Sequence, residues 1–422
     1  MNTSHGEKQH FVTLEWFRFI LSLYIVIFHT FNYNDAPKFI REIVDTGFFA
    51  TSSFFILSGF ILAHVYLKNK GTENVMLREK SSHFLIKRFA NLWPIHIISM
   101  VIFILMMMSL PFFNISPGDA NSSIRYVMFD ATDGTPYEEL KHYMSNTELW
   151  IAIITNIFMI NSWNPYYMVF NFPTWSISTL FFFYMLFPFI AVKLNRLKRP
   201  YFFLFLLNAA ALVPVSLLLI YTNMGYPEAG FLHRNPIIRL PEFVGGILLC
   251  HIYHKNRVEN KLPDFKRMCV LITTLVVGLG VAKLFIYMMA NHWDSWYIAY
   301  HLLHNGLILS LEMLFIYVVI NLPDIKSEKW VAISEKLGSS SLPLFALHMP
   351  IFYIFIRLQK LFEGNPMLCL SDFTACTKAV SKDPSYIYYG IYLIVTIYLC
   401  ILFQRNVVIP IRKAIIKNII KQ

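Results

Sequence analysis

The chain has 422 residues, of which 56% are hydrophobic, 17% aromatic and 14% charged. Soluble domains carry about 25% charged residues, so this composition excludes an ordinary soluble domain and a disordered chain, and it predicts a multi-span membrane protein. Five cysteines are too few for a disulfide scaffold, and the net charge of +11 fits basic cytoplasmic loops better than nucleic-acid binding.

Ten stretches are apolar enough to cross a membrane, since a transmembrane helix needs about 20 mostly apolar residues. They are residues 11–31, 47–66, 92–113, 175–194, 202–221, 237–254, 268–289, 298–320, 340–360 and 386–404. A further apolar stretch at 147–162 is short, and we expect a re-entrant or interfacial helix there. If it crossed the membrane, the basic stretches after it would lie outside, against the tendency of Lys and Arg to collect on the cytoplasmic side.

These stretches predict an all-α protein, a polytopic transmembrane helix bundle that forms one domain over residues 11–404. Residues 1–10 are expected to form a cytoplasmic N-terminal segment and residues 405–422 a basic cytoplasmic tail. The first stretch is not expected to be a cleaved signal peptide, because Glu15 and Arg18 interrupt its apolar run.

Two outer loops carry further expectations. The longest, about 114–146, is polar and acidic, and we expect it to pack against the membrane domain. Cys369 and Cys376 share a later outer loop, where a disulfide and two free thiols both remain open.

Arg18 and His29 lie in the first predicted span. A charge inside a span costs about 2.5–3.5 kcal/mol on insertion scales, so such groups indicate pairing or function. The two residues are eleven apart, which places them on one helix face with a rise of about 16 Å. Glu15 can pair with Arg18 one turn away. The pattern fits a functional pair, and it also fits a structural ion pair with a packed histidine.

The span at 237–254 opens with a second possible ion pair, between Arg239 and Glu242. Gly245 and Gly246 follow, and they allow another backbone to approach. In the span at 47–66, the dipeptide Ser58-Gly59 predicts close packing or a kink.

One segment with two prolines and one with two basic residues carry further candidates. In the span at 340–360, Pro343 and Pro350 are expected to break the helix on both sides of His348, which serves either packing or chemistry. Lys87 and Arg88 lie in the predicted loop before the third span, where they either follow the positive-inside rule or bind a phosphate-rich cytoplasmic ligand.

The segment after Asn171 is expected to start a helix at Pro173. Trp175 is a candidate interface anchor there, while Ser176, Ser178 and Thr179 can bond to carbonyls one turn back and bend the helix.

Two HxxH pairs occur, His251/His254 and His301/His304. No third ligand at metal-site spacing accompanies either pair, so we expect no metal.

Taken in chain order, these motifs resemble the integral-membrane acyltransferase 3 family from about residue 11 to 404. The first span is similar to the family's acid, Arg, ten residues, His pattern. The other matching segments are FFILSGFIL (54–62), KRFANLWP (87–94), PTWSISTLFFFYMLFP (173–188), RLPEFVGGIL (239–248) and LGSSSLPLFALHMP (337–350). Leu180 replaces a glutamate that most relatives have, and Leu342 and Phe345 replace two usual tyrosines, so the site assignments depart from the family pattern there.

The resemblance implies an O-acyltransferase that moves an acyl group, commonly acetyl, from coenzyme A to a hydroxyl. The acceptor is usually a cell-surface polysaccharide or its lipid-linked precursor, and some relatives modify small molecules. Acyl-CoA is then the donor substrate, and the expected location is a bacterial inner membrane with both termini cytoplasmic. A membrane lipid is the other expected partner, and nucleic acid is not.

Each candidate site residue is given a role on this basis. His29 is the base or acyl carrier. The candidates are His29, Arg18 and Glu242 for catalysis, Lys87, Arg88 and Arg18 for the donor, and Ser58, Trp175, Ser176, Tyr184, Arg239 and His348 for binding or positioning the substrate.

Other functions remain as alternatives. A transporter of lipid or glycan intermediates also suits broken helices with buried charges, although no internal repeat is visible. A glycan polymerase would favour large outer loops rich in Arg, and the outer segments here are poor in it.

Overall fold

The computed structural model describes residues 11–33, 35–47, 49–69, 75–109, 123–292, 295–323, 325–381 and 383–420. The predicted segment at 1–10, the first part of the outer loop up to residue 122 and the last two residues lie outside the described residues. The described strands form two antiparallel hairpins, β1 (Leu67–Asn69) with β2 (Val75–Leu77) and β3 (Tyr126–Met128) with β4 (Lys141–Tyr143).

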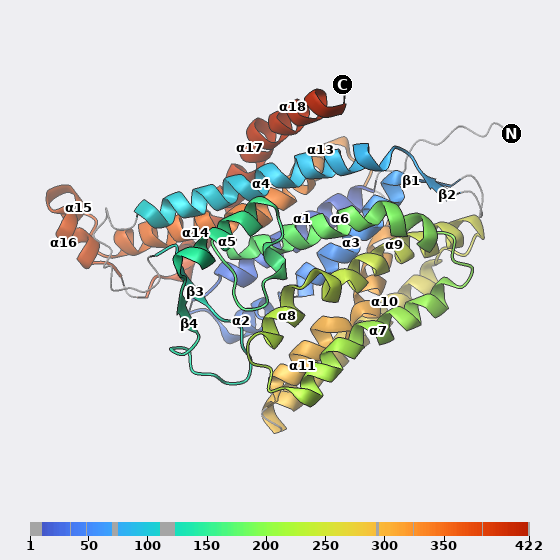
Figure 1. Ribbon diagram of the computed structural model, residues 1–422, viewed down its shortest axis with the longest axis horizontal. Helices are drawn as coiled ribbons and strands as arrows, with labels where there is room; N and C mark the ends of the chain where they lie inside the picture. The colour runs from blue at the N-terminus through green and yellow to red at the C-terminus, as the bar shows by residue number, and fades with distance from the viewer. Residues whose placement is uncertain are drawn as a thin grey trace.

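Long helices make up most of the molecule and run roughly along its longest axis (Figure 1). They are α1 (Val12–Thr30), α3 (Phe49–Tyr66), α4 (Ser81–Ser109), α6 (Trp175–Leu194), α7 (Pro200–Tyr221), α9 (Pro236–Val258), α10 (Phe265–His292), α14 (Ser341–Glu363) and α17 (Tyr389–Phe403). A tenth span is bent by 55° between Trp296–Leu307 and Leu309–Ile320. It consists of α11 (Trp296–Leu302), the kinked segment η5 (Leu303–Leu307) and α12 (Leu309–Ile320).

Among the described residues, nine helical stretches are long and apolar enough to cross a membrane, and the bent one raises the number to ten. This confirms the predicted polytopic helix bundle. On α10, most large apolar side chains are exposed, as on a helix that faces lipid. The protein is therefore a membrane protein.

Shorter helices connect the spans. They are α2 (Lys38–Val44), α5 (Asn146–Ile157), α8 (Glu228–Arg234), α13 (Glu328–Ser339), α15 (Leu368–Ser371), α16 (Phe373–Lys378) and α18 (Ile409–Ile420), with short turns η3 (Asn161–Trp163), η4 (Phe172–Thr174), η6 (Tyr386–Tyr388) and η7 (Gln404–Val408). α5 begins with a capping box, because Ser145 and Glu148 each bond to the other's backbone N–H. Its 12 residues reach only about 18 Å, so α5 is too short to cross a membrane.

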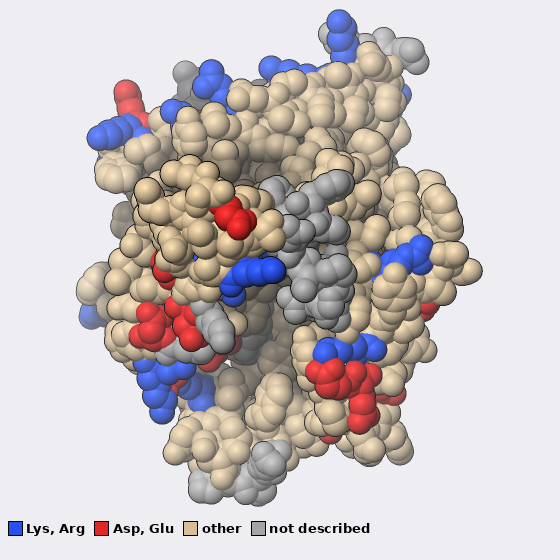
Figure 2. All heavy atoms as spheres, turned by 90° about the vertical axis from the view of Figure 1, so that its left-hand side faces the viewer, with Lys and Arg blue, Asp and Glu red and all other residues tan. Residues whose placement is uncertain are grey.

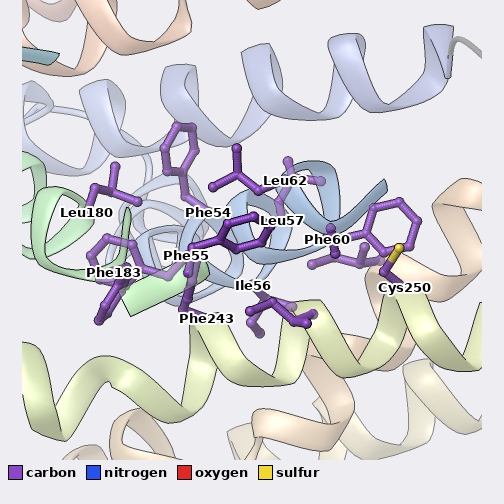
Figure 3. Close-up of a cluster of buried hydrophobic side chains, with 14 of the residues drawn as sticks. Phe54, Phe55, Ile56, Leu57, Phe60, Leu62, Leu180, Phe183, Phe243 and Cys250 are labelled. Atoms are coloured by element: carbon purple, nitrogen blue, oxygen red, sulfur yellow. The ribbon is translucent and has the colours of Figure 1, made fainter. Parts of the chain in front are cut away.

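The core is densest where α3 crosses α9. Gly59 and Gly246 make this approach possible: a Cβ on Gly59 would lie 2.2 Å from the Phe243 carbonyl oxygen, and one on Gly246 would lie 1.8 Å from the Ile56 carbonyl oxygen. Aromatic rings then close the contact with α6, since Phe183 packs 5.3 Å from Phe55 and 5.0 Å from Phe243 between ring centroids (Figure 3). Of the two expectations for Ser58-Gly59, close packing and a kink, the structure shows close packing.

One prediction about helix bounds was wrong. α4 already begins at Ser81, so Lys87 and Arg88 lie within a helix and not in a loop before it. The first two turns of α4 contain many polar residues, so a criterion based on hydropathy alone places the start of this helix too late.

The basic segments meet at one end of the bundle, the end that carries β1 and β2 in Figure 1. Arg196, just after α6, donates to the Val75 carbonyl at 2.8 Å, and the His251 ring lies 3.0 Å from the Leu197 carbonyl. The opposite end carries α2, β3, β4, α15 and α16. Figure 2 looks onto that opposite end and shows a mostly uncharged surface with a hollow near its centre.

The described part of the long acidic loop packs against the membrane domain, as expected. Thr132 donates to the Met224 carbonyl at 3.1 Å, and the Phe129 ring stacks 4.4 Å from that of Tyr226. At the same end, Cys369 and Cys376 form a disulfide that joins α15 to α16, which decides the alternative that the sequence left open.

Candidate active site

His29 and His348 form the centre of the candidate site. They are 319 residues apart in the chain, yet His29 Nδ1 lies 3.0 Å from His348 Nε2, and the two rings are parallel within 4°. His29 is the next-to-last residue of α1 and keeps an exposed side chain, whereas His348 in α14 is fully buried. The residue that can meet a substrate is therefore His29, with His348 behind it.

The hydrogen bonds fix which nitrogen of His29 is free. His348 Nδ1 lies 3.2 Å from the Leu344 carbonyl oxygen, and a carbonyl can only accept, so this nitrogen carries the proton. In a neutral imidazole the other nitrogen then accepts, so His348 Nε2 accepts from His29 Nδ1–H. His29 Nε2 is left with a lone pair. The sequence proposed a base or acyl carrier at this residue, and the arrangement provides the nitrogen for either role.

α14 is held in place at His348 by two bonds from other elements. Pro350 has no N–H, so the Ala346 carbonyl one turn earlier loses its helical donor. The Asn171 amide replaces that donor at 2.6 Å, and the Tyr392 hydroxyl donates to the His348 carbonyl at 3.0 Å. α14 therefore runs unbroken through Pro350, and Pro343 lies in its first turn. The expectation that both prolines break this helix was wrong.

Arg18 lies on α1 and pairs with Glu15, as predicted, with 3.1 Å between Arg18 Nη1 and Glu15 Oε2. Gly338 leaves room for the carboxylate, since a Cβ there would lie 2.0 Å from Glu15 Oε2. The α1 helix is continuous from Val12 to Thr30, so Arg18 and His29 share one face about 16 Å apart, as the spacing predicts.

Tyr184 and Ser58 lie along the same interior region as Arg18. The Ser58 hydroxyl donates to the Phe54 carbonyl at 2.8 Å and is also bonded to the Tyr184 phenol. The side chain of Tyr184 interacts electrostatically with both Arg88 and Arg18. Arg88 in turn donates to the Tyr66 hydroxyl at 2.6 Å. Four residues chosen from sequence motifs are thus brought together between α1, α3, α4 and α6.

Lys87 and Arg88 line a groove of about 340 Å³ between α4 and α18. The rest of its lining is Arg412, Lys413, Ile416 and Lys417, so five of the six residues are cationic. Lys87 also pairs with Glu79, and Arg412 Nη1 lies 3.5 Å from Asn91 Oδ1. The contribution of α18 was missed from the sequence, where its basic residues were read as a tail.

Glu242 and Arg239 form the predicted ion pair, with 2.6 Å between Arg239 Nη2 and Glu242 Oε1. Arg239 also donates to Ser52 Oγ at 2.6 Å and to the His304 carbonyl at 3.0 Å. Both side chains are buried, and the contacts described for Glu242 are with these neighbours and not with His29 or His348.

Trp175 and Ser176 are buried at the start of α6. Trp175 is only 7% exposed and packs edge-on against His233 at 4.9 Å, so it is not an anchor at the lipid surface. Ser176 donates to the Pro173 carbonyl and Thr179 to the Trp175 carbonyl, so both bond to carbonyls about one turn back, as expected. Ser178 differs, because it bonds to the Met159 carbonyl.

His233 and Asp130 were missed from the sequence. The His233 imidazole interacts electrostatically with His29 and lies 3.8 Å from Asp130 Oδ2, while Arg234 pairs with the same carboxylate. Burial acts to raise the pKa of Asp130, but the neighbouring His233 and the Arg234 charge outweigh it and hold the pKa at about 2. The available signal was the run His-Arg-Asn-Pro at 233–236, directly before a predicted span.

The HxxH pairs are explained by hydrogen bonds. His301 Nε2 lies 3.1 Å from Thr132 Oγ1, and His64 Nδ1 lies 3.2 Å from His254 Nε2. The Cys250 Sγ atom lies near the contact between His64 and His254, so that three possible ligand atoms lie within 4.8 Å of one another. Sequence spacing did not show this group, because His64 comes from another helix. The His64 and His254 rings are parallel within 2° at 5.2 Å, the edge-to-edge arrangement of one N–H···N bond.

Comparisons with known proteins identify the family of this chain. The family model described as an acyltransferase domain, that of acyltransferase 3, matches residues 11–405. A curated relative, acyltransferase MdmB from Streptomyces mycarofaciens, is 25% identical over 230 residues, which are 50% of this chain and 48% of the relative. The chain thus aligns with about half the length of that relative. No solved structure matches. Because the family match covers nearly the whole chain, this membrane protein belongs to the acyltransferase 3 family.

Proposed function

We propose that this acyltransferase moves an acyl group, acetyl in the first instance, from coenzyme A to a hydroxyl of a cell-surface polysaccharide or its lipid-linked precursor. The observation that carries the proposal is the His29–His348 pair. It leaves His29 Nε2 unprotonated on a residue classed as exposed, and transfer to a hydroxyl needs a base.

The basic groove supports a coenzyme A donor. The pyrophosphate and ribose phosphate of coenzyme A are strongly anionic, and Lys87, Arg88, Arg412, Lys413 and Lys417 offer five cations in one groove. From there, Tyr66, Tyr184 and Ser58 continue inward toward Arg18. The thioester arm would follow this polar line and then cover the ~16 Å from Arg18 to His29 along α1.

The reaction then needs one general base, which later returns the proton to the leaving thiolate. The acceptor oxygen attacks the thioester carbonyl carbon while His29 Nε2 takes the hydroxyl proton. The carbon–sulfur bond breaks, and the imidazolium returns its proton to the departing thiolate, so that an ester and free coenzyme A are formed. His348 Nε2 accepts from His29 Nδ1–H throughout and stabilises the imidazolium. Attack of His29 Nε2 on the thioester, to give an acyl-histidine, is the other course that the same free nitrogen permits.

The acceptor is assigned to the end of the bundle opposite β1 and β2. α1 runs toward that end, where the surface has a hollow (Figure 2), and His29 keeps an exposed side chain. His233, which packs against the buried Trp175, offers a partly exposed polar group that suits a sugar hydroxyl. Arg239, which is paired with Glu242, would support this site indirectly through its bonds to Ser52 and to the His304 carbonyl.

The proposed location is a bacterial inner membrane with both termini cytoplasmic. The support is that segments rich in Lys and Arg meet at the end with β1 and β2. Reporter fusions after Lys68, Leu197 and Gln422 are then expected to read cytoplasmic, and a fusion at Asp133 to read external. A fusion after Leu197 that reads external would reverse the orientation of everything after α5.

The direct test uses purified protein in lipid nanodiscs with acetyl coenzyme A and a glycan fraction from the host. Release of free coenzyme A thiol should require both substrates and disappear in His29→Ala. Mass spectrometry of surface glycans from cells with and without the gene then identifies the acceptor. A protein that binds acetyl coenzyme A but releases no thiol with any hydroxyl acceptor, polymeric or small, would contradict the proposed reaction.

A further inference from the structure

Two carboxylates and one guanidinium are buried together between α9 and α12, in a membrane span. Glu242 is 6% exposed, Glu312 8% and Arg239 1%. Arg239 holds Glu242 in an ion pair, and its other bonds go to Ser52 and to the His304 carbonyl. With both carboxyl groups ionised, the group contains one more negative charge than positive charge, and a buried charge without a counterion is costly.

Among the residues that the structure describes, three oxygen atoms here have no hydrogen-bond partner. They are Glu242 Oε2, Glu312 Oε1 and Asn305 Oδ1, from three side chains that are each more than nine-tenths buried. All three residues line one cavity of about 10 Å³. That volume holds the centre of about one water-sized sphere, so the oxygens surround a space for a single small species.

The backbone beside the cavity is not a regular helix. η5 contains a kink, with non-helical backbone at Asn305 (φ −111°, ψ 33°) and Gly306 (φ +134°), and the span bends by 55° here. A kink of this kind interrupts the regular helical hydrogen bonds, and broken helices in membrane proteins can bind ions through freed carbonyls and helix ends. Gly306 permits the bend, because a Cβ there would lie 2.8 Å from Ala211 Cβ and the positive φ would strain it.

From these observations we propose that Glu242, Glu312 and Asn305 form a binding site for a single sodium ion. Oxygen donors of this kind bind hard cations. One positive charge balances the excess carboxylate, and a divalent ion would overcompensate it. The small cavity favours sodium over the larger potassium ion. The proposal goes beyond acyl transfer and does not depend on it.

Thermal unfolding tests the site without any assay of activity. The purified protein in nanodiscs is unfolded in sodium chloride, potassium chloride or choline chloride at equal ionic strength. A ligand that binds only the folded protein raises its stability with concentration. The unfolding midpoint should rise by several degrees as sodium replaces choline, and by clearly less with potassium. An equal midpoint in sodium and choline would overturn the proposal and leave a proton on a carboxyl or on His304 as the balancing charge.

Variants locate the effect. Glu312→Gln removes the excess charge and keeps the shape, so it should lose the sodium response while remaining at least as stable as the wild type in choline. Glu42→Gln is the control, since Glu42 is a half-exposed carboxylate on α2, and it should keep the response. A sodium response that survives in Glu312→Gln refutes the site. If Glu312→Gln does not fold, the comparison of sodium with choline in the wild type still decides.

Discussion

Removing His348 should slow acyl transfer less than removing His29, and the structure gives the size of the difference. His29→Ala removes the base itself, which typically costs ~10²–10⁴-fold in rate. His348→Ala removes one hydrogen bond to His29 Nδ1–H. That bond is charge-assisted once His29 becomes an imidazolium, so its loss is worth about 1.5–3 kcal/mol, or roughly a tenfold to hundredfold loss of kcat.

The assay is release of coenzyme A thiol by protein in nanodiscs, with donor and acceptor varied separately. His348→Ala should lower kcat and leave the KM for the donor unchanged, because His348 lies behind His29 and away from the basic groove. Gln has an amide oxygen that can accept from His29 Nδ1–H, so His348→Gln should recover part of the rate. A packing role alone would not predict this recovery.

A matched control is the second parallel histidine pair. His254→Ala breaks the contact with His64, which has nearly the same geometry, and should leave kcat unchanged. The reasoning fails if His348→Ala is inactive while His29→Ala keeps near wild-type turnover, because the roles would then be reversed. It also fails if His348→Gln is no better than His348→Ala, since the bond to His29 would then carry none of the effect.

Three further predictions concern the donor groove and stability. Neutralising Arg88 or Arg412 with Gln should raise the KM for acetyl coenzyme A by roughly tenfold to hundredfold and leave kcat nearly unchanged, since each charged bond to phosphate is worth about 1.5–3 kcal/mol; equal donor affinity in both variants would move the donor elsewhere. The folded pKa of Asp130, about 2, lies below its ordinary value of 3.8. Above pH 4 the free energy of unfolding of the wild type should therefore exceed that of Asp130→Asn by about 2 kcal/mol, and equilibrium unfolding should show this advantage disappear as the pH falls toward 2. A constant difference across that range would contradict the charge argument. Gly246→Ala should destabilise the fold by about 1–3 kcal/mol, because its Cβ would meet the Ile56 carbonyl, whereas Gly280→Ala, with nothing within 4 Å, should not; similar midpoints for the two variants would refute the close approach.

The spans could be predicted from the sequence because bilayer thickness fixes a length and an apolar composition that hydropathy detects. The shared face of Arg18 and His29 also followed from helix geometry, since both residues lie in one unbroken helix. The start of α4 did not follow, because its first turns, around Lys87, are polar on one face and extend beyond the apolar stretch.

The contacts between distant segments could not be predicted in this way. No local pattern places His348 against His29 across 319 residues, or α18 against α4. Motif similarity named His348 as a positioning residue but gave it no partner. Glu312 shows another limit: a single acid in an apolar stretch draws little notice until the fold places it beside Glu242 and a broken helix.

Two separate parts of the chain, α4 and α18, line the basic groove, and the sequence of one can change without a change in the other. The family match ends at residue 405, whereas Arg412, Lys413 and Lys417 lie beyond it. Three of the five cationic lining residues therefore come from a segment outside the matched domain. On the donor site proposed above, exchange or loss of this helix alone would change how firmly the groove holds an anionic donor, without altering the helices that carry His29 and His348.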